Sequence, residues 1–237
     1  DWGRFLGLYM GDGSLSRDTL SIVCDGKDKD LIAEVERLFG SVLELEPHTR
    51  TVGEKKGGAE VRSGSTRLIP LFDRLGFIHR NGSGGMTRRV HVPEIIWRSP
   101  PGVVREFLRG LFEADGFNSY GHARVTLFSK DMDFLKDVQL LLLAFGIPCK
   151  RSTRQTHNKT HSYIANTLDL RADESRLFCE RIGFLSARKD RKIPIYQKGH
   201  PPKPVALEDD VVSVDKDGFE QTFDLTVEGG EAFELFD

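Results

Sequence analysis

The chain is poor in cysteine and has no long apolar run. Its three cysteines, Cys24, Cys149 and Cys179, are odd in number, widely separated and without a CxxC pair. Neither a disulfide framework nor a zinc knuckle is therefore expected, and we predict reduced, mostly buried thiols. The longest apolar run, Leu140 to Phe145, is far shorter than the roughly 20 residues that span a bilayer, so no membrane partner is expected.

Two further signals are missing. The sequence opens on Asp1-Trp2-Gly3-Arg4, without the basic, apolar and small-residue order of a signal peptide. We therefore expect a cytoplasmic or nucleoid-associated protein that is not secreted. No phosphate-binding GxxxxGK segment is present, so no nucleotide cofactor is expected.

Charge is distributed unevenly along the chain. Residues 205–237 hold eleven acidic side chains and one basic one, a net charge of −10, whereas residues 1–204 hold 33 basic and 25 acidic side chains, a net charge of +8. The overall charge of −2 therefore conceals a basic body, which a polyanion would meet, and an acidic tail. By itself, this distribution is equally compatible with a merely uneven surface.

The sequence repeats itself at an offset of about 103 residues. FLGLYMGDGS (5–14) corresponds to FLRGLFEADGF (107–117), which aligns Asp12-Gly13 with Asp115-Gly116. Two further blocks follow in the same order: KDKDLIAEVERLFG (27–40) with SKDMDFLKDVQLLLLAFG (129–146), and TRLIPLFDRLGFI (66–78) with ESRLFCERIGFL (174–185). We expect two similar halves related by a pseudo-twofold axis, with boundaries 1–98 and 99–204, followed by a tail, 205–237.

Each copy is expected to form a helix, two strands, a helix, two strands and a helix. The first helices are predicted over 2–11 and 103–114, with left-handed caps at Gly13 and Gly116. Asp28 or Asp30, and Asp131 or Asp133, are expected to cap the second helices. Strands are predicted over 20–24, 42–50, 59–63, 124–128, 147–154 and 162–170, and a loop over 81–85.

Small residues lie four apart on each first helix, Gly7 and Gly11 in one copy and Gly110 and Ala114 in the other. Two such faces can pack backbone to backbone, which brings Asp12 and Asp115 together at the pseudo-dyad. Both carboxylates then lie at negative helix ends, where a divalent cation would stabilise them. The alternative is that each Asp-Gly pair merely ends its helix.

These two segments, FLGLYMGDG and LRGLFEADG, resemble the signature helices of the LAGLIDADG homing endonucleases. The resemblance covers about residues 1–200 and implies an α+β fold of two αββαββα repeats with a β-saddle, forming a monomer that cuts both strands of a long DNA site. It also implies Mg²⁺, for which Mn²⁺ can substitute, and a basic residue near each active site. The catalytic candidates are Asp12, Asp115, Lys189, Lys192 and Arg89, and the metal candidates are Asp12, Asp115, Gly11 and Ala114.

In such a saddle the exposed strand positions should contact phosphates and base edges. The candidates are Arg17, Ser21, His48, Arg50, Lys55, Lys56 and Arg62 in the first copy, and Asn118, Tyr120, Arg124, Lys150, Arg151, Arg154, His157, Lys159 and His161 in the second. Because the two sets differ, the double-stranded DNA site should be only partly palindromic. The HxxxH spacing of His157 and His161 lacks an evident third ligand, so DNA contact or solvent exposure is favoured over zinc.

The tail segment DDVVSVDKDGFEQTFDLTVEG (209–229) is similar to the late splicing block of inteins. The chain neither begins with Cys or Ser nor ends in His-Asn, and protein splicing needs a nucleophile at the junction. We therefore infer an intein-type endonuclease without its splicing halves, the alternative for the tail being an ordinary β-hairpin. The rival function is a DNA- or RNA-binding protein, regulator or maturase-like, that has lost cleavage on the same scaffold.

Overall fold

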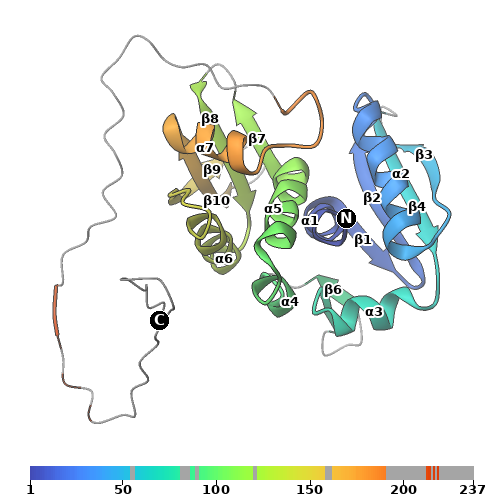
Figure 1. The fold of residues 1–237 in the computed structure, drawn as a ribbon, viewed down its shortest axis with the longest axis horizontal. Helices are drawn as coiled ribbons and strands as arrows, with labels where there is room; N and C mark the ends of the chain where they lie inside the picture. The colour runs from blue at the N-terminus through green and yellow to red at the C-terminus, as the bar shows by residue number, and fades with distance from the viewer. Residues whose placement is uncertain are drawn as a thin grey trace. The chain divides into compact units, whose positions relative to one another are not determined.

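Two halves with the same order of elements follow one another in the computed structural model (Figure 1). The structure describes residues 1–53, 57–80, 86–88, 91–119, 122–157, 162–190, 212–214, 216 and 218. Residues 1–202 and 203–237 form separate units, and the fold concerns the first of these.

The elements of the first half are α1 (Trp2–Asp12), β1 (Gly13–Ser16), β2 (Thr19–Asp25), α2 (Lys29–Leu43), β3 (His48–Val52), β4 (Gly58–Gly64) and α3 (Leu68–Arg74). Those of the second half are α5 (Pro101–Asp115), β7 (Gly116–Ser119), β8 (Arg124–Ser129), α6 (Met132–Leu143), β9 (Lys150–His157), β10 (Ser162–Arg171) and α7 (Asp173–Arg181). Between them lie β5 (Ile78–Arg80), β6 (Met86–Arg88) and α4 (Glu94–Trp97). The expected α+β fold of two αββαββα repeats is therefore confirmed.

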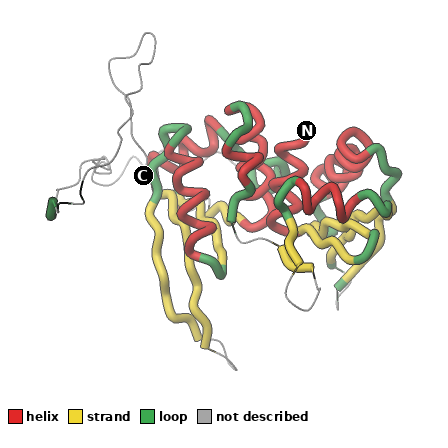
Figure 2. The backbone as a smooth tube through the Cα atoms, turned by 90° about the horizontal axis from the view of Figure 1, so that it is seen from below, coloured by secondary structure: helices red, strands yellow, loops and turns green. Residues whose placement is uncertain are grey.

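Each half contains one antiparallel sheet, of strand order β1-β2-β4-β3 in the first and β7-β8-β10-β9 in the second. The sheets lie on one side and most of the helices on the other (Figure 2). Alternation along β2 buries Leu20, Ile22 and Cys24 on the helix side. Among the described residues, no helix combines the length and the apolar character needed to cross a membrane.

The helices α1 and α5 pack with their backbones in contact. A Cβ atom on Gly7 would lie 2.1 Å from the carbonyl oxygen of Phe107, and one on Gly110 would lie 2.3 Å from that of Arg4. Both distances are shorter than van der Waals contact, so only glycine fits. The expectation that the small-residue faces pack together is confirmed.

The two halves also bury corresponding aromatic side chains. The rings of Tyr9 and Phe72 lie 4.5 Å apart in the first half, and those of Phe112 and Phe178 lie 4.5 Å apart in the second. These pairs link α1 to α3 and α5 to α7 in the same way, at separations favourable for aromatic contact. Each central helix is thus anchored to its own half.

Several expectations about element ends were wrong. The strand predicted over 147–154 runs instead from Lys150 to His157. The strand predicted over 42–50 begins only at His48, because α2 continues to Leu43. Val42 lies one helical turn after Leu38, and both side chains are buried on the same face of α2. The apolar pattern there belongs to the helix rather than to a strand.

The glycines that follow α1 and α5 are not left-handed caps. Gly13 and Gly116 have extended conformations, with φ of −80° and −85°. A Cβ on Gly13 would lie 2.4 Å from the carbonyl oxygen of Tyr9, and one on Gly116 would lie 2.4 Å from that of Phe112. These glycines are needed for space, because the chain passes directly from helix to strand.

The helix contact predicts opposite effects for two glycine-to-alanine changes. Gly7→Ala should lower the free energy of unfolding by about 1–3 kcal/mol, since the added methyl group overpacks the backbone of α5. Gly40→Ala, on the exposed side of α2 with no atom near the new methyl group, should raise it by about 0.4–1 kcal/mol. Urea unfolding measures both, and equal effects would contradict the proposed role of α1–α5 packing.

Candidate active site at the pseudo-dyad

Asp12 and Asp115 are the last residues of α1 and α5, whose ends meet. A Cβ on Gly11 would lie 2.2 Å from the Cβ of Ala114 and 3.4 Å from the carboxyl carbon of Asp115. The Asp115 carboxyl group therefore lies beside the end of α1. Asp12 is exposed and Asp115 is partly exposed. The structure thus brings the four metal candidates together at one place.

Glu113 has a structural contact that the sequence did not reveal. It is 2% exposed, and its carboxylate accepts hydrogen bonds from the backbone N–H groups of Leu185 and Ser186, at 2.8 and 3.0 Å, and from the Ser186 hydroxyl at 2.7 Å. The corresponding residue of the first copy is Met10, which is buried among apolar side chains. Glu113 therefore fastens the segment after α7 onto α5.

Lys189 lies in that fastened segment. Its Nζ donates hydrogen bonds to the carbonyl oxygens of Glu113 and, at 2.8 Å, Gly116, both at the end of α5. A cation at this position offsets the negative end of the helix dipole. Burial lowers the pKa of the Lys189 ammonium from its usual value, while Glu113 opposes the shift. Although Lys189 is far from α5 in sequence, it therefore contacts the end of that helix directly, on either side of Asp115.

Arg188 joins the two halves. Its Nε lies 2.9 and 3.0 Å from the two carboxylate oxygens of Asp28, and its Nη2 lies 2.6 Å from one of them. Asp28 is 5% exposed and precedes α2, where it makes no side-chain cap hydrogen bond. The backbone N–H of Ala187 donates to Asp30 at 2.8 Å. The expected cap at Asp131 does form, through hydrogen bonds from Asp133 and Phe134.

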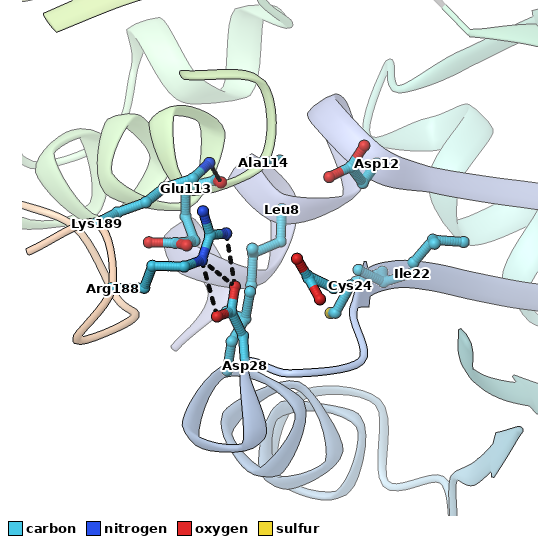
Figure 3. Close-up of a pocket in the computed structure, with 12 residues that line it drawn as sticks. Leu8, Asp12, Ile22, Cys24, Asp28, Glu113, Ala114, Arg188 and Lys189 are labelled. Atoms are coloured by element: carbon cyan, nitrogen blue, oxygen red, sulfur yellow. Dashed lines mark hydrogen bonds and ion pairs between the residues drawn. The ribbon is translucent and has the colours of Figure 1, made fainter. Parts of the chain in front are cut away.

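Asp12 and four of the residues just described, Glu113, Lys189, Arg188 and Asp28, line one pocket of about 70 Å³ (Figure 3). Its polar side chains are Asp12, Asp25, Asp28, Glu113, Arg188 and Lys189, and its walls include Leu8, Ile22 and Cys24. Burial, together with the nearby acids, raises the pKa of the Cys24 thiol to about 12, so this thiol stays protonated at neutral pH. The pocket is therefore a polar, predominantly acidic space beside the helix ends.

The sheet of the first half presents polar side chains on its face away from the helices. Ser21 and His48 are both paired with Arg62, so these residues form one row across three strands. In the next row Arg50 pairs with Glu60 and forms an ion pair with it. His48 and Arg50 are exposed, whereas Ser21 is only 7% exposed and offers little surface to a ligand. Arg17 is exposed in the turn between β1 and β2.

The second sheet carries a polar network on the equivalent face. Asp169, 4% exposed, accepts hydrogen bonds from Arg124, at 2.9 Å to its Nε, and from Thr126 at 2.9 Å. Burial acts to raise the pKa of this carboxyl group, but these donors bring it below its usual value. Lys150 is paired with Asp169 and Arg154 with Ala165, which places both on the same face.

The strand register separates other DNA-contact candidates from this face. Arg151 is exposed on the opposite face of β9, because it pairs with the buried Leu168. The Asn118 amide donates at 2.8 Å to the carbonyl oxygen of Lys189. For His157 only the backbone, in β9, is described. Seven other candidates and the expected loop over 81–85 lie outside the described residues: Lys55, Lys56, Arg89, Tyr120, Lys159, His161 and Lys192.

The Arg188–Asp28 contact predicts a measurable contribution to stability. Arg188→Met should lower the free energy of unfolding by about 1–3 kcal/mol, because it leaves a buried carboxylate without its charged donor. Arg98→Met is the matched control, since Arg98 and Glu94 form a highly exposed pair, and its effect should stay within about 0.5 kcal/mol. In an Asp28→Asn background Arg188→Met should cost less, and an undiminished cost would show that the two side chains are not coupled.

Comparison with known proteins adds a family match. The family described as "LAGLIDADG-like domain" matches residues 102–183, which run from the first turn of α5 to just beyond α7. The match therefore falls on the second half, whose motif FEADG is the more regular of the two.

Three curated proteins with different functions share sequence with the chain. A probable translation initiation factor IF-2 of Thermococcus kodakarensis is 31% identical over 146 residues, 62% of this chain and 12% of that protein. A DNA polymerase of Thermococcus litoralis is 29% identical over 203 residues, 80% of this chain and 11% of that protein. A glutamine–fructose-6-phosphate aminotransferase of Methanocaldococcus jannaschii is 27% identical over 197 residues, 80% of this chain and 17% of that protein. The chain thus spans only a small part of these relatives.

A solved structure shares the fold. The structure of I-DmoI in complex with DNA and Mn superimposes with a TM-score of 0.53 at 19% identity, and the match covers 76% of this chain and 94% of that one. I-DmoI is a homing endonuclease. The arrangement of helices and sheets is therefore the one that the repeated motif had indicated, and the resemblance to LAGLIDADG homing endonucleases is confirmed in the fold and in the LAGLIDADG-like domain over residues 102–183.

Proposed function

We propose that the chain is a divalent-metal-dependent endonuclease that acts as a monomer and cuts both strands of a specific DNA site. The observation that carries this proposal is the meeting of two aspartates, Asp12 and Asp115, at helix ends in backbone contact. Two carboxylates at one place, beside two polar sheet faces, suit hydrolysis of two phosphodiesters close to one another.

The residues at the helix ends fit Mg²⁺, with Mn²⁺ as a substitute. Mg²⁺ is commonly held by one or two carboxylates, with water and substrate phosphate completing its coordination. Within the described part of the chain, His, Cys, Asp and Glu side chains form no group of three that could hold a metal ion. Asp12 and Asp115 supply the charged ligands, and the carbonyls of Gly11 and Ala114 are the neutral candidates. When bound, the cation would stabilise charge on the phosphate and lower the pKa of water.

The chain's own residues then have separate roles. Asp12 and Asp115 would hold the cation beside the scissile phosphates, and the hydrogen bonds of Lys189 to Glu113 and Gly116 keep the end of α5 in place. Lys189 also adds positive charge close to the negative phosphates. Arg188 directs its Nε and Nη2 to Asp28, so its proposed role is to hold the segment against the first half.

The polar faces of the two sheets are the proposed DNA-binding surface. His48, Arg50, Arg62, Arg124, Lys150 and Arg154 lie there and supply donors for phosphates and base edges. The two faces differ in sequence, so the preferred site is long and only partly palindromic. We retain 1–98 and 99–204 as the two repeats and 205–237 as a separate tail.

An origin in an intein accounts for the relatives. A translation factor, a polymerase and an aminotransferase have no common function, yet each shares with this chain a segment that is a small part of its length. A segment inserted into unrelated proteins explains such a pattern, and the tail segment 209–229 resembles a splicing block. That segment lies outside the described residues except at 212–214, 216 and 218.

Replacing either aspartate by asparagine should greatly reduce DNA cleavage while leaving DNA binding intact. Asp12→Asn and Asp115→Asn keep the side-chain size and remove the charge, so each should reduce double-strand cleavage with Mg²⁺ by far more than about tenfold, or ~1.4 kcal/mol. Binding to the same site, measured by gel shift with Ca²⁺, should persist, because removing a carboxylate reduces repulsion of phosphates.

Two outcomes would overturn the assignment. Unchanged cleavage in both variants would exclude the aspartates from catalysis. A wild-type chain that binds a selected site tightly but cuts it with neither Mg²⁺ nor Mn²⁺ would instead be the binding protein that has lost cleavage.

The basic body predicts a steep salt dependence of duplex binding. The logarithm of the association constant should fall linearly with the logarithm of salt concentration, with a slope of about −0.9 for each phosphate neutralised. Arg154→Gln, on the exposed sheet face, should make the slope less negative by about 1, whereas Arg98→Gln, just after α4, should leave it unchanged. A flat dependence in the wild type would contradict binding along the sheets.

A further inference from the structure

Two phenylalanines are exposed on the polar face of the second sheet. Phe117 on β7 is 57% exposed and Phe128 on β8 is 48% exposed. Phe117 pairs with Thr126, and Phe128 lies two residues further along β8, so both side chains project from the face that bears Arg124. They are diagonal neighbours, a spacing that aromatic side chains can bridge.

The fold itself does not require these rings. Gly13 pairs with Ile22 in the first sheet, and Gly116 pairs with Leu127 in the second. Ser14 therefore corresponds to Phe117, and Val23 corresponds to Phe128. A serine and a valine therefore suffice there. The core of the second half is filled by other aromatic side chains, among them Phe112 and Phe178, from the opposite direction. Phe117 and Phe128 thus leave apolar surface in water, at a cost that burial by a ligand would remove.

Their position relates them to the proposed cleavage centre. Phe117 lies two residues after Asp115. Phe128 lies one residue after Leu127, which is paired with Gly116. Polar groups surround them on the same face: Arg124 is held by Asp169, and Thr167, which pairs with Phe128, has its hydroxyl 2.7 Å from that of Ser152. An apolar patch framed by fixed donors matches a major groove, where the only apolar feature of a base edge is the methyl group of thymine.

We propose that Phe117 and Phe128 contact thymine C5-methyl groups in the half of the DNA site bound by the second repeat. This inference rests on the proposed DNA-binding function. The aromatic pair makes that half-site selective for thymine close to the cleavage centre, and Arg124, preset by Asp169, reads or anchors an adjacent position. The first repeat, with Ser14 in place of one ring, lacks the same selectivity.

Deoxyuridine tests the proposal, because it differs from thymidine only by the missing methyl group. A site is first selected from a randomised duplex library with the full chain. Each thymine of that site is then replaced singly by deoxyuridine and the dissociation constant is measured. One or two replacements should weaken binding by about fourfold each, corresponding to ~0.8 kcal/mol for a buried methyl-sized group.

Variants assign the effect to the aromatic pair. Phe117→Ser and Phe128→Ser should bind thymine and deoxyuridine duplexes equally at the sensitive positions. Ile164→Ser is the matched control: Ile164 is 63% exposed on the same sheet but on its opposite face, so the wild-type deoxyuridine pattern should persist. Circular dichroism spectra check that all three variants fold.

The outcomes separate this inference from the proposed function. Tight binding of a selected site with no loss at any deoxyuridine overturns the role of the phenylalanines and leaves site-specific DNA binding intact. If the loss of affinity at deoxyuridine persists in both phenylalanine variants, the role of the phenylalanines is likewise overturned and site-specific DNA binding is left intact. Failure of the library to yield any preferred duplex overturns the proposed function itself.

Discussion

The contact between the backbones of α1 and α5 is the constraint on which the rest of the structure depends. Gly7 and Gly110 are placed where any side chain would collide with a carbonyl group of the other helix. The helices can therefore approach to the short end of the usual ~8–10 Å interaxial range. This one contact sets the positions of both helix ends and of the strands that start there.

The two halves share this framework but divide other tasks unequally. In the second half the motif residue Glu113 fastens the segment 184–190, whereas its counterpart Met10 merely fills the core. That segment then reaches the first half through Arg188 and Asp28. A pseudosymmetric fold thus supports an asymmetric site, and the two aspartates have different surroundings: Asp12 is more exposed than Asp115.

The sequence predicted those features that depend on local pattern or on repetition. The paired glycines indicated the helix contact, and the order of the repeated blocks indicated the two halves. The Arg188–Asp28 contact joins residues 160 positions apart, and nothing near either residue marks the other as its partner. Glu113 was hidden for the same reason. The exposed Phe117 and Phe128 were also missed. An aromatic residue in a strand is normally taken as core, and no strand had been located over 116–119, where β7 pairs Phe117 with Thr126.

The direct passage from helix to strand at Asp12-Gly13 and Asp115-Gly116 has an energetic consequence. Each aspartate stands between two hydrogen-bonded elements, with no loop to give its backbone alternative conformations. Ordering one backbone residue costs about 1–2 kcal/mol of conformational entropy, and at these positions folding has already met that cost. The backbone that carries the carboxylates is thus preorganised. A charged ligand bound between them would cost little further backbone entropy, and its binding free energy would be spent on contact rather than on ordering the chain.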